Sequence, residues 1–120
     1  MLVDRDEKLV AVTKEAVDKL GVNSIIVIAD VTKEADVNNY VAKAVEAFGT
    51  IDGFFNNAGI EGVVRPIEEY PEDVFDRVMA VNVRGVFLGC KYAIPAMKAH
   101  GGSIINMSSM TGVRAQADLA

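Results

Sequence analysis

The sequence predicts an α/β fold in which a parallel sheet of about four strands is covered by helices on both faces. Short runs rich in Ile and Val alternate along the chain with longer segments whose apolar residues recur at helical spacing. No linker, repeat or low-complexity segment interrupts this alternation. We therefore expect residues 1–120 to form a single domain.

Four segments have the pattern of strands. Met1 to Asp4 looks like the end of a strand, and β-branched runs follow at residues 24–29, 53–55 and 103–107. The expected order of elements is therefore β-α-β-α-β-α-β. Because a strand begins at the first residue, the sequence suggests that an element before it is missing and that the fold is truncated.

Three helices are predicted between the strands. The first spans residues 6–20, and its expected inward face consists of Leu9, Val10, Val12, Ala16, Val17 and Leu20. Thr32 is expected to cap a second helix that Gly49 stops, with an inward face of Val37, Val41, Ala44, Val45 and Phe48. A third, longer helix is expected from near Pro71 to about His100, and Pro95 should kink or end it.

The composition excludes several classes of function. With a net charge of −5 and a pI near 4.8, the chain lacks the basic surface that binds nucleic acid or an anionic membrane. It contains no run approaching the roughly 18 apolar residues of a membrane span. Its single cysteine, Cys90, rules out an internal disulfide and is typical of a reducing compartment, so we expect a cytoplasmic location.

Polar residues follow the ends of the first three predicted strands, at the edge where ligands bind in open α/β sheets. Asp4 and Asp30 stand at strand ends, where an acid either contacts a ligand or favours the N-terminus of the next helix. The segment Asn56-Asn57-Ala58-Gly59 follows an apolar strand directly, and its Ala-Gly pair would let a ligand approach the backbone. The same segment is equally compatible with an ordinary polar turn.

Two further features indicate chemistry. Asn82 lies between Val81 and Val83 inside the long predicted helix, where a buried amide either bonds a broken helix backbone or organises a polar site. The apolar run that closes on Ser108 and Ser109 would deliver hydroxyls to the carboxyl edge of the sheet. The sequence therefore places a candidate site where this edge meets the long helix.

Other reactive side chains are expected to be structural. Cys90 and His100 have no second ligand at a metal-binding spacing, so no metal site is predicted. Lys91 and Tyr92 would make an acid–base pair, but adjacent helix residues point about 100° apart and should not share a face.

Together and in this order, the motifs resemble the short-chain dehydrogenase/reductase family over essentially the whole chain. The residues that carry the resemblance are Asp30-Val31-Thr32, Asn56-Asn57-Ala58-Gly59, Val81-Asn82-Val83 and Gly102 to Ser109. The resemblance implies a three-layer Rossmann-like sheet and an NAD(P)-dependent oxidoreductase. In the family's reaction, hydride passes between the nicotinamide and the carbon of a small alcohol or carbonyl compound.

The resemblance also implies how the cofactor would be held. Asp4 would hydrogen-bond the adenosine ribose, which favours NAD(H) over NADP(H). The cation of Arg5 beside it could instead bind the 2′-phosphate of NADP(H). Asp30 and Val31 would flank the adenine. The cofactor channel would be lined by Asn56, Ala58 and Gly59.

For catalysis, the resemblance implies that Asn82 holds a water in a proton relay and that Ser109 hydrogen-bonds the reacting oxygen of the substrate. The family's acid–base tyrosine and its lysine would fall just beyond Ala120, and its Gly-rich pyrophosphate turn would precede residue 1. Neither Tyr70 nor Tyr92 lies in a Tyr-x-x-x-Lys setting. We therefore expect the 120-residue chain alone to be nearly inert and to bind the cofactor weakly or not at all.

The resemblance further predicts a gap in the sheet, because the family's first strand lies between its second and fourth strands. Unpaired strand edges are costly, so we expect a remedy. Either Met1 to Val3 moves into the central position and gives a sheet ordered 2-1-3-4, or another chain fills the gap. Family members often pair through the long helix, so a homo-oligomer through residues 71–100 is also expected.

Two other classes of function stay open. One is a non-catalytic fragment, pseudoenzyme or assembly module that keeps the fold without turnover. The other is a phospho-receiver domain with Asp4, Asp6 and Asp30 around Mg²⁺, which would leave the Asn-Asn-Ala-Gly and Ser-Ser segments unexplained.

Overall fold

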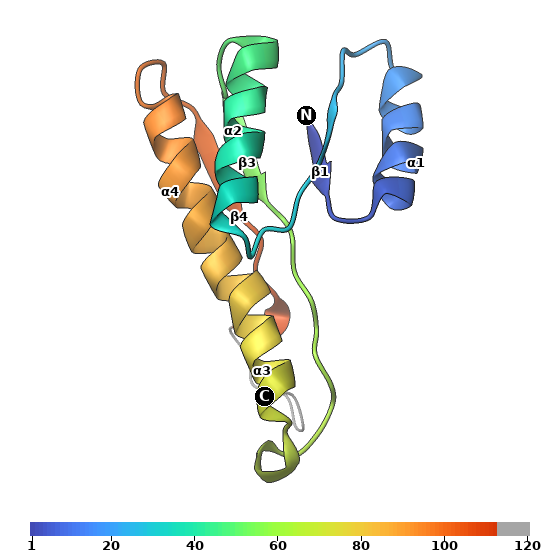
Figure 1. The fold of residues 1–120 in the computed structure, drawn as a ribbon, viewed down its shortest axis with the longest axis vertical. Coiled ribbons are helices and arrows are strands. Elements are labelled where there is room, and N and C mark those ends of the chain that lie inside the picture. The colour runs from blue at the N-terminus through green and yellow to red at the C-terminus, as the bar shows by residue number, and fades with distance from the viewer. Residues whose placement is uncertain (113–120) are drawn as a thin grey trace.

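The computed structural model describes residues 1–112 and has alternating strands and helices, as predicted (Figure 1). The strands are β1 (Leu2–Asp4), β2 (Ile26–Ile28), β3 (Gly53–Asn56) and β4 (Ser103–Asn106). The α-helices are α1 (Glu7–Asp18), α2 (Glu34–Phe48), α3 (Glu72–Met79) and α4 (Val86–Met97). A π-helical segment η2 (Ala80–Gly85) joins α3 to α4, and short 3-10 turns occur at η1 (Ile67–Glu69) and η3 (Met110–Gly112).

The predicted gap divides the strands into two parallel pairs. β1 pairs with β2 in the register Leu2↔Ile26, and β3 pairs with β4 in the register Gly53↔Ser103. The expectation that Met1 to Val3 would move into the central position is wrong. β1 pairs with β2 but not with β3, so within residues 1–112 the strands form two separate two-stranded sheets and not one sheet ordered 2-1-3-4. That another chain fills the gap stays a prediction.

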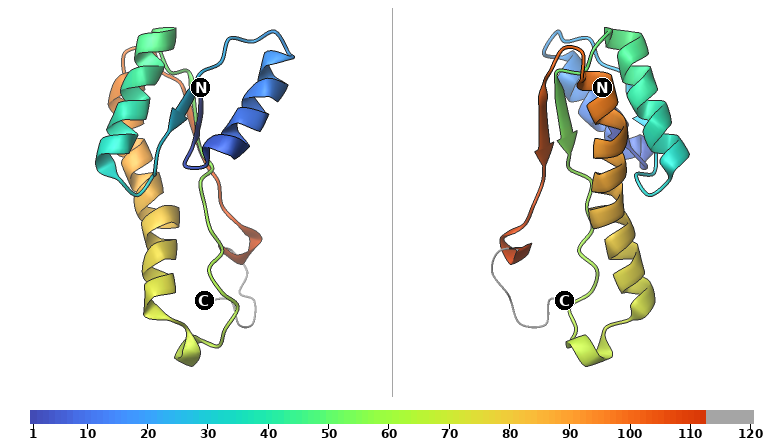
Figure 2. Two further views of the ribbon diagram at one scale, coloured as in Figure 1. Left: turned by 45° about the vertical axis from the view of Figure 1, so that its right-hand side comes forward. Right: turned by 90° about the vertical axis from the view of Figure 1, so that its left-hand side faces the viewer.

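The helices lie on both faces of the strands, and the core lies on the face covered by α2 and α4. Val37, Val41 and Ala44 of α2 are buried there, and Leu88 of α4 packs into the same cluster. Figure 2 shows β3 and β4 side by side, with α4 along one face of the pair. On the opposite face, Phe55 and Ile105 are 54% and 58% exposed.

The first helix buries less than its sequence predicts. Val10 is its only buried residue, whereas Leu9 and Val12 are 65% and 66% exposed and Leu20 beyond its end is 78% exposed. The helix packs mainly on β1 and β2, and these two short strands cover only part of its apolar face. Asp6 is the N-cap and accepts hydrogen bonds from the backbone N–H groups of Lys8 and Leu9.

The second helix ends as predicted but begins differently. Gly49 terminates it with a φ of 81°, a left-handed value that suits glycine. The predicted cap at Thr32 is wrong, because Lys33 occupies the N-cap position without a side-chain bond and Thr32 instead donates to Asp30. The inward face also includes the buried Tyr40, whereas Phe48 is 38% exposed.

The long predicted helix is continuous in space but changes its winding at η2 (Figure 1). Pro71 is the N-cap residue of α3, so its missing N–H costs no helical hydrogen bond. Pro95 lies inside α4, which ends two residues later at Met97. Within residues 1–112, no helix combines the length and apolar character needed to cross a membrane.

Candidate functional site

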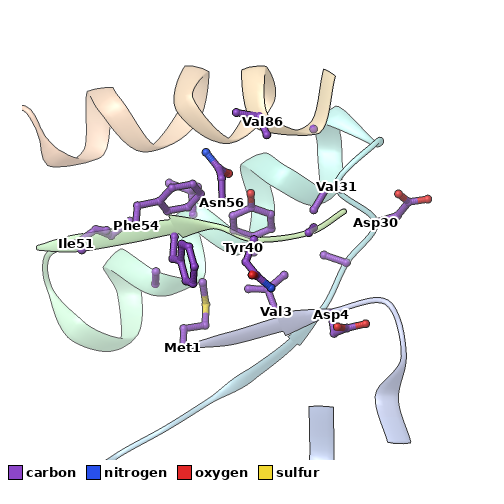
Figure 3. Close-up of a pocket in the computed structure, with 18 of the residues that line it drawn as sticks. Met1, Val3, Asp4, Asp30, Val31, Tyr40, Ile51, Phe54, Asn56 and Val86 are labelled. Atoms are coloured by element: carbon purple, nitrogen blue, oxygen red, sulfur yellow. The ribbon is translucent and has the colours of Figure 1, made fainter. Parts of the chain in front are cut away.

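The gap between β1 and β3 contains a cavity of about 620 Å³, within the size range of ligand pockets (Figure 3). It is lined both by residues at the carboxyl ends of β1, β2 and β3, where the polar motifs lie, and by residues near their amino ends such as Met1 and Ile51. All six residues predicted to bind the cofactor line it: Asp4, Asp30, Val31, Asn56, Ala58 and Gly59. The fold therefore brings together residues that are more than 50 positions apart in the sequence.

The two predicted acids have different surroundings. Asp4 is the last residue of β1, and its Oδ1 accepts a 2.9 Å hydrogen bond from the backbone N–H of Asp6. Asp30 is half-buried, and its Oδ1 accepts bonds from the backbone N–H of Thr32 at 2.9 Å and from Thr32 Oγ1 at 2.7 Å. These two bonds, the backbone one first, lower the pKa of Asp30 below its ordinary value of 3.8. Asp30 is thus held as a carboxylate at neutral pH.

A close contact between helix and strand end shapes the cavity next to Val31. A Cβ added to Gly85 would lie 3.0 Å from Val31 Cγ2 and 3.3 Å from Val31 Cβ. Because Gly85 has no side chain, η2 can approach Val31, which lies in the segment between β2 and α2. Gly85 and Val86 line the same cavity as Val31, so the contact sets the wall on the side of the helix.

Asn56 is engaged in holding the strands together. Its Nδ2 donates to Oδ1 of Asn106, its partner in the register of β3 and β4, at 2.8 Å. Cys90 of α4 lies beside this pair, with its Sγ 3.6 Å from Asn56 Nδ2 and 3.8 Å from Asn106 Oδ1. The role of Asn106 was missed at the level of sequence, although its position in the strand before the two serines marks it as an unusual polar residue.

Asn82 reaches across to the segment that follows β3. Its Oδ1 accepts a 2.9 Å bond from the backbone N–H of Ile60, and its Nδ2 donates at 2.9 Å to the carbonyl of Ile60. The expectation of a buried amide is wrong, because Asn82 is exposed. It does lie where the helix winding is broken, in η2, and Ile60 lines the cavity. Asn82 therefore positions one wall of the candidate site.

Ser109 follows β4 at the same carboxyl edge. Its carbonyl accepts a 3.0 Å bond from the backbone N–H of Gly112 in η3. Ser109 is not among the residues that line the cavity, and neither is Asn82. The two residues predicted to be catalytic thus lie outside the cavity that the six predicted cofactor residues share.

The expectation that Lys91 and Tyr92 point apart is wrong. Lys91 Nζ and Tyr92 Oη each lie 2.6 Å from Oε1 of Glu34, and Lys91 Nζ is 5.3 Å from the centre of the Tyr92 ring. Their long side chains converge on Glu34 although their Cα–Cβ bonds diverge. The hydrogen bond to Glu34 is the largest cause of the raised pKa of both Lys91 and Tyr92. The cluster ties α2 to α4 and does not line the cavity.

The described part of the chain offers no other tyrosine suited to proton transfer in the cavity. Tyr40 lines it but is 96% buried, since its exposure is 4%, and burial raises its pKa to about 12. Tyr70, which follows η1, is not among the residues that line the cavity. The part of the site that the structure describes can therefore bind a polar ligand through carboxylates and glycine backbone groups. It contains no tyrosine placed to act as a general acid or base.

A comparison with protein families matches residues 1–120 to the short chain dehydrogenases. Levodione reductase of Leifsonia aquatica is 41% identical over 116 residues, which are 94% of this chain and 43% of that protein. An uncharacterized oxidoreductase of Bacillus subtilis is 45% identical over 106 residues, which are 88% of this chain and 39% of that protein.

Solved structures agree with the sequence comparison. The crystal structure of levodione reductase superposes with a TM-score of 0.95 at 38% identity, covering 99% of this chain and 47% of that one. The structure of NAD⁺-bound xylitol dehydrogenase gives a TM-score of 0.95 at 35% identity, covering 98% and 46%. The chain spans less than half the length of each of these relatives. By the match over its whole length, the chain belongs to the short-chain dehydrogenase family.

Proposed function

We propose that the chain supplies the central part of an NAD(P)-dependent oxidoreductase that transfers hydride between a nicotinamide cofactor and a small alcohol or carbonyl compound. The observation that carries this proposal is the shared cavity of the six cofactor residues at the carboxyl ends of both strand pairs. The names of the similar proteins, a levodione reductase and an NAD⁺-bound xylitol dehydrogenase, support the same class of reaction.

The residues present fit a dinucleotide. The carboxylate of Asp4 uses Oδ1 to accept one backbone bond, and a carboxylate has further acceptor capacity for ribose hydroxyls. The negative charge would repel a 2′-phosphate, so we propose that NAD(H) is preferred over NADP(H). Asp30 and Val31 would flank the adenine, and the backbone at Ala58 and Gly59 would allow close approach of the ligand.

When bound, the nicotinamide supplies or accepts the hydride; the chain's own residues orient the partners. We propose that the Ser109 hydroxyl hydrogen-bonds the reacting oxygen of the substrate. Both polar atoms of the Asn82 side chain are bonded to Ile60, so its side chain keeps the Ile60 backbone in place. We propose that Asn82 also holds the water of a proton relay, since its Nδ2 has a second N–H and its Oδ1 a second lone pair.

The proposal includes that the 120-residue chain alone does not turn over. Its sequence contains no Tyr-x-x-x-Lys, and two of its three tyrosines are engaged elsewhere: Tyr40 is buried in the core and Tyr92 bonds Glu34. Loss of a general acid–base costs about 10² to 10⁴ in rate. A non-catalytic role that retains the fold is therefore the second candidate for this chain.

We also propose that the chain associates with a second copy through its long helix and acts in the cytoplasm, without nucleic-acid or membrane partners. Apolar residues along this helix are exposed, namely Phe75, Met79, Val83, Phe87 and Ile94. The single cysteine and the acidic charge balance support the cellular location and the absence of nucleic-acid binding.

Titration of the purified chain with NADH and NADPH, followed by cofactor fluorescence, tests the proposal. Saturable binding of NADH in the micromolar range, with weaker binding of NADPH, would support a cofactor site in this chain. Asp4→Asn should reduce the ratio of NADH affinity to NADPH affinity about tenfold. Glu7→Gln removes a neighbouring charge outside the cavity and should leave this ratio unchanged. Absence of saturation with both cofactors would favour the non-catalytic candidate.

A further inference from the structure

The loop that joins β2 to α2 forms a tight turn around the two residues proposed to flank the adenine. The backbone N–H of Lys33 donates to the carbonyl of Asp30 at 2.9 Å, which closes the turn. The N–H of Asp30 in turn donates to Oδ2 of Asp36 in α2, also at 2.9 Å. Asp30 and Val31 line the cavity, and Figure 3 shows them at one end of it, near the helix that carries Val86.

A hydrogen bond from the long helix fixes the other side of this turn. Arg84 of η2 donates from a guanidinium nitrogen to the carbonyl of Thr32 at 2.6 Å, across 52 positions of sequence. That carbonyl belongs to the same peptide group as the N–H of Lys33, which bonds Asp30. The peptide group is therefore held at both ends, by the turn on one side and by η2 on the other. Because its donor is charged, the bond from Arg84 is expected to be stronger than one between neutral groups.

Arg84 bonds this carbonyl although a carboxylate lies nearby. The pKa of Glu34 is lowered chiefly by its hydrogen bond from Lys91 and also, to a smaller extent, by the charge of Arg84. Lys91 Nζ lies 2.6 Å from Glu34 Oε1, whereas no ion pair of Arg84 is found among residues 1–112. Lys91 thus takes the carboxylate, which leaves the guanidinium to the carbonyl of Thr32.

The segment η2 contacts the loops that follow both β2 and β3. Asn82 bonds both backbone polar groups of Ile60, and Gly85 lets the helix approach Val31. Ile60, Val31 and Gly85 all line the cavity, whereas Arg84 does not. Arg84 is therefore connected to the cavity through the turn that it holds.

We propose that Arg84 is a positioning residue of the adenosine subsite: by its bond to Thr32, it holds the turn that places Asp30 and Val31 beside the adenine of the cofactor. This inference rests on the proposed function, since it takes the adenine to lie beside those two residues. Without the bond, the peptide group after Thr32 is held on one side only. The turn must then be ordered when a ligand binds, which weakens the affinity.

Three variants test the hydrogen bond without any ligand. Arg84→Met removes the donor and keeps a long side chain, whereas Arg84→Lys keeps a charged donor. The matched control is Arg77→Met, because Arg77 pairs with Asp73 on α3 and does not line the cavity. Amide hydrogen exchange at Lys33 should be about tenfold faster in Arg84→Met, the factor expected for loss of one charged hydrogen bond, and unchanged in Arg77→Met.

The pKa of Asp30 gives a second measure of the turn. The backbone bond from Thr32 is the largest cause of its lowered value, and the charges that lower it further are those of Lys33 and Arg5. A rise toward 3.8 in Arg84→Met would therefore report a loosened turn and not the lost charge of Arg84. We expect this rise by carboxyl carbon NMR in Arg84→Met, and a value close to wild type in Arg84→Lys.

Titration with ADP-ribose and with NADH tests the subsite. Both ligands carry the adenosine, whereas only NADH carries the nicotinamide. We would follow binding by NMR, which measures weak affinities, since the chain is expected to bind the cofactor weakly. Arg84→Met should weaken the binding of both ligands by the same factor of about ten, Arg84→Lys should stay within about threefold of wild type, and Arg77→Met should equal wild type. If Arg84→Met unfolds by circular dichroism, Arg84→Gln takes its place.

The inference alone is overturned if Arg84→Met binds ADP-ribose as tightly as the wild type does, or if Lys33 exchange and the Asp30 pKa do not change. A larger loss for NADH than for ADP-ribose also overturns it, because the effect would then lie at the nicotinamide. If the wild type binds neither ligand, the proposed function fails and the inference with it. The wild-type titration therefore tells the two failures apart.

Discussion

Asn82 holds Ile60 at both of its backbone polar groups, accepting from the N–H and donating to the carbonyl, each at 2.9 Å. The two residues are 22 positions apart. A polar side chain in the unusually wound part of the long helix thereby fixes the segment that leaves β3. A Cβ added to Gly59 would lie 3.5 Å from Asn82 Oδ1, so the amide also packs closely against the predicted cofactor segment.

Asn82→Ala should lower the free energy of unfolding by about 1–3 kcal/mol, because two hydrogen bonds of roughly 0.5–1.5 kcal/mol each are lost. Asn82→Asp should also destabilise, since it keeps an acceptor for the Ile60 N–H but sets a carboxylate against the Ile60 carbonyl. Asn38→Ala, on the exposed face of α2, is the control and should change little. Urea denaturation measures the free energy of unfolding of all three variants. Equal effects of the Asn82 and Asn38 substitutions would contradict a stabilising role of the two Asn82–Ile60 hydrogen bonds.

Gly89→Ala should destabilise the chain and disturb the paired asparagines. The added Cβ would overlap Asn56 Oδ1 and lie 3.1 Å from Phe54 Cε1, so either α4 or the Asn56 side chain must move. Overpacking of this kind costs about 1–3 kcal/mol. Gly53→Ala is the control, because a Cβ there meets nothing within 4 Å. Denaturation curves should separate the two, and side-chain amide NMR signals of Asn56 and Asn106 should shift only in Gly89→Ala.

Thr32→Val should raise the pKa of Asp30 toward 3.8, because one of its two hydrogen bonds disappears while the bond from the backbone remains. A carboxyl whose pKa is lowered by folding stabilises the fold above its ordinary pKa, and this stabilisation is lost as the pH falls through the lowered value. The difference in unfolding free energy between wild type and Thr32→Val should therefore be largest near neutral pH and shrink below pH 3.8.

Carboxyl carbon NMR titration measures the Asp30 pKa in both chains. Thr13→Val is the control, since Thr13 Oγ1 bonds the carbonyl of Leu9 and touches no carboxylate. If the Asp30 pKa is the same with and without Thr32 Oγ1, the hydroxyl bond has no electrostatic effect on it.

Phe87→Glu should weaken self-association of the chain. Phe87 is 63% exposed on the long helix, and a carboxylate there would be desolvated in an apolar interface. Leu9→Glu is a matched control, because Leu9 is 65% exposed on α1. Sedimentation velocity should show at least a tenfold weaker dimer for Phe87→Glu and no change for Leu9→Glu. If the wild-type chain is monomeric even at high concentration, the proposed self-association through the long helix is wrong.

The order of strands and helices could be predicted from the sequence because each element has a recognisable local pattern of residues. Ile and Val runs mark β2 and β4, and Gly49 stops α2 at a positive φ. The exposed face of α1 could not be predicted, since Leu9 and Val12 have the spacing of a buried face and only the neighbouring elements decide what covers them. Periodicity describes the helix, not its neighbours.

The candidate site, too, could be predicted from the sequence only in part. That the residues after strand ends gather at one edge follows from parallel topology, and the cavity lined by Asp4, Asp30 and Gly59 agrees with it. Which partner a polar side chain takes depends on three-dimensional contacts. Thr32 bonds Asp30 where a helix cap was expected, and Lys91 and Tyr92 meet at Glu34 although their Cα–Cβ bonds diverge.

The π-helical winding of Ala80–Gly85 sets the rotation of everything that follows it. One residue turns an α-helix by about 100° and lengthens it by only about 1.5 Å. The extra residue in each turn of η2 thus aims α4 so that Gly85 faces Val31 and Gly89 faces Asn56. Deletion of a single residue there would hardly shorten the helix, yet it would swing both glycines away from the strands and bring side chains in their place. In this stretch the number of residues therefore constrains the fold as well as the identities of Asn82 and Gly85.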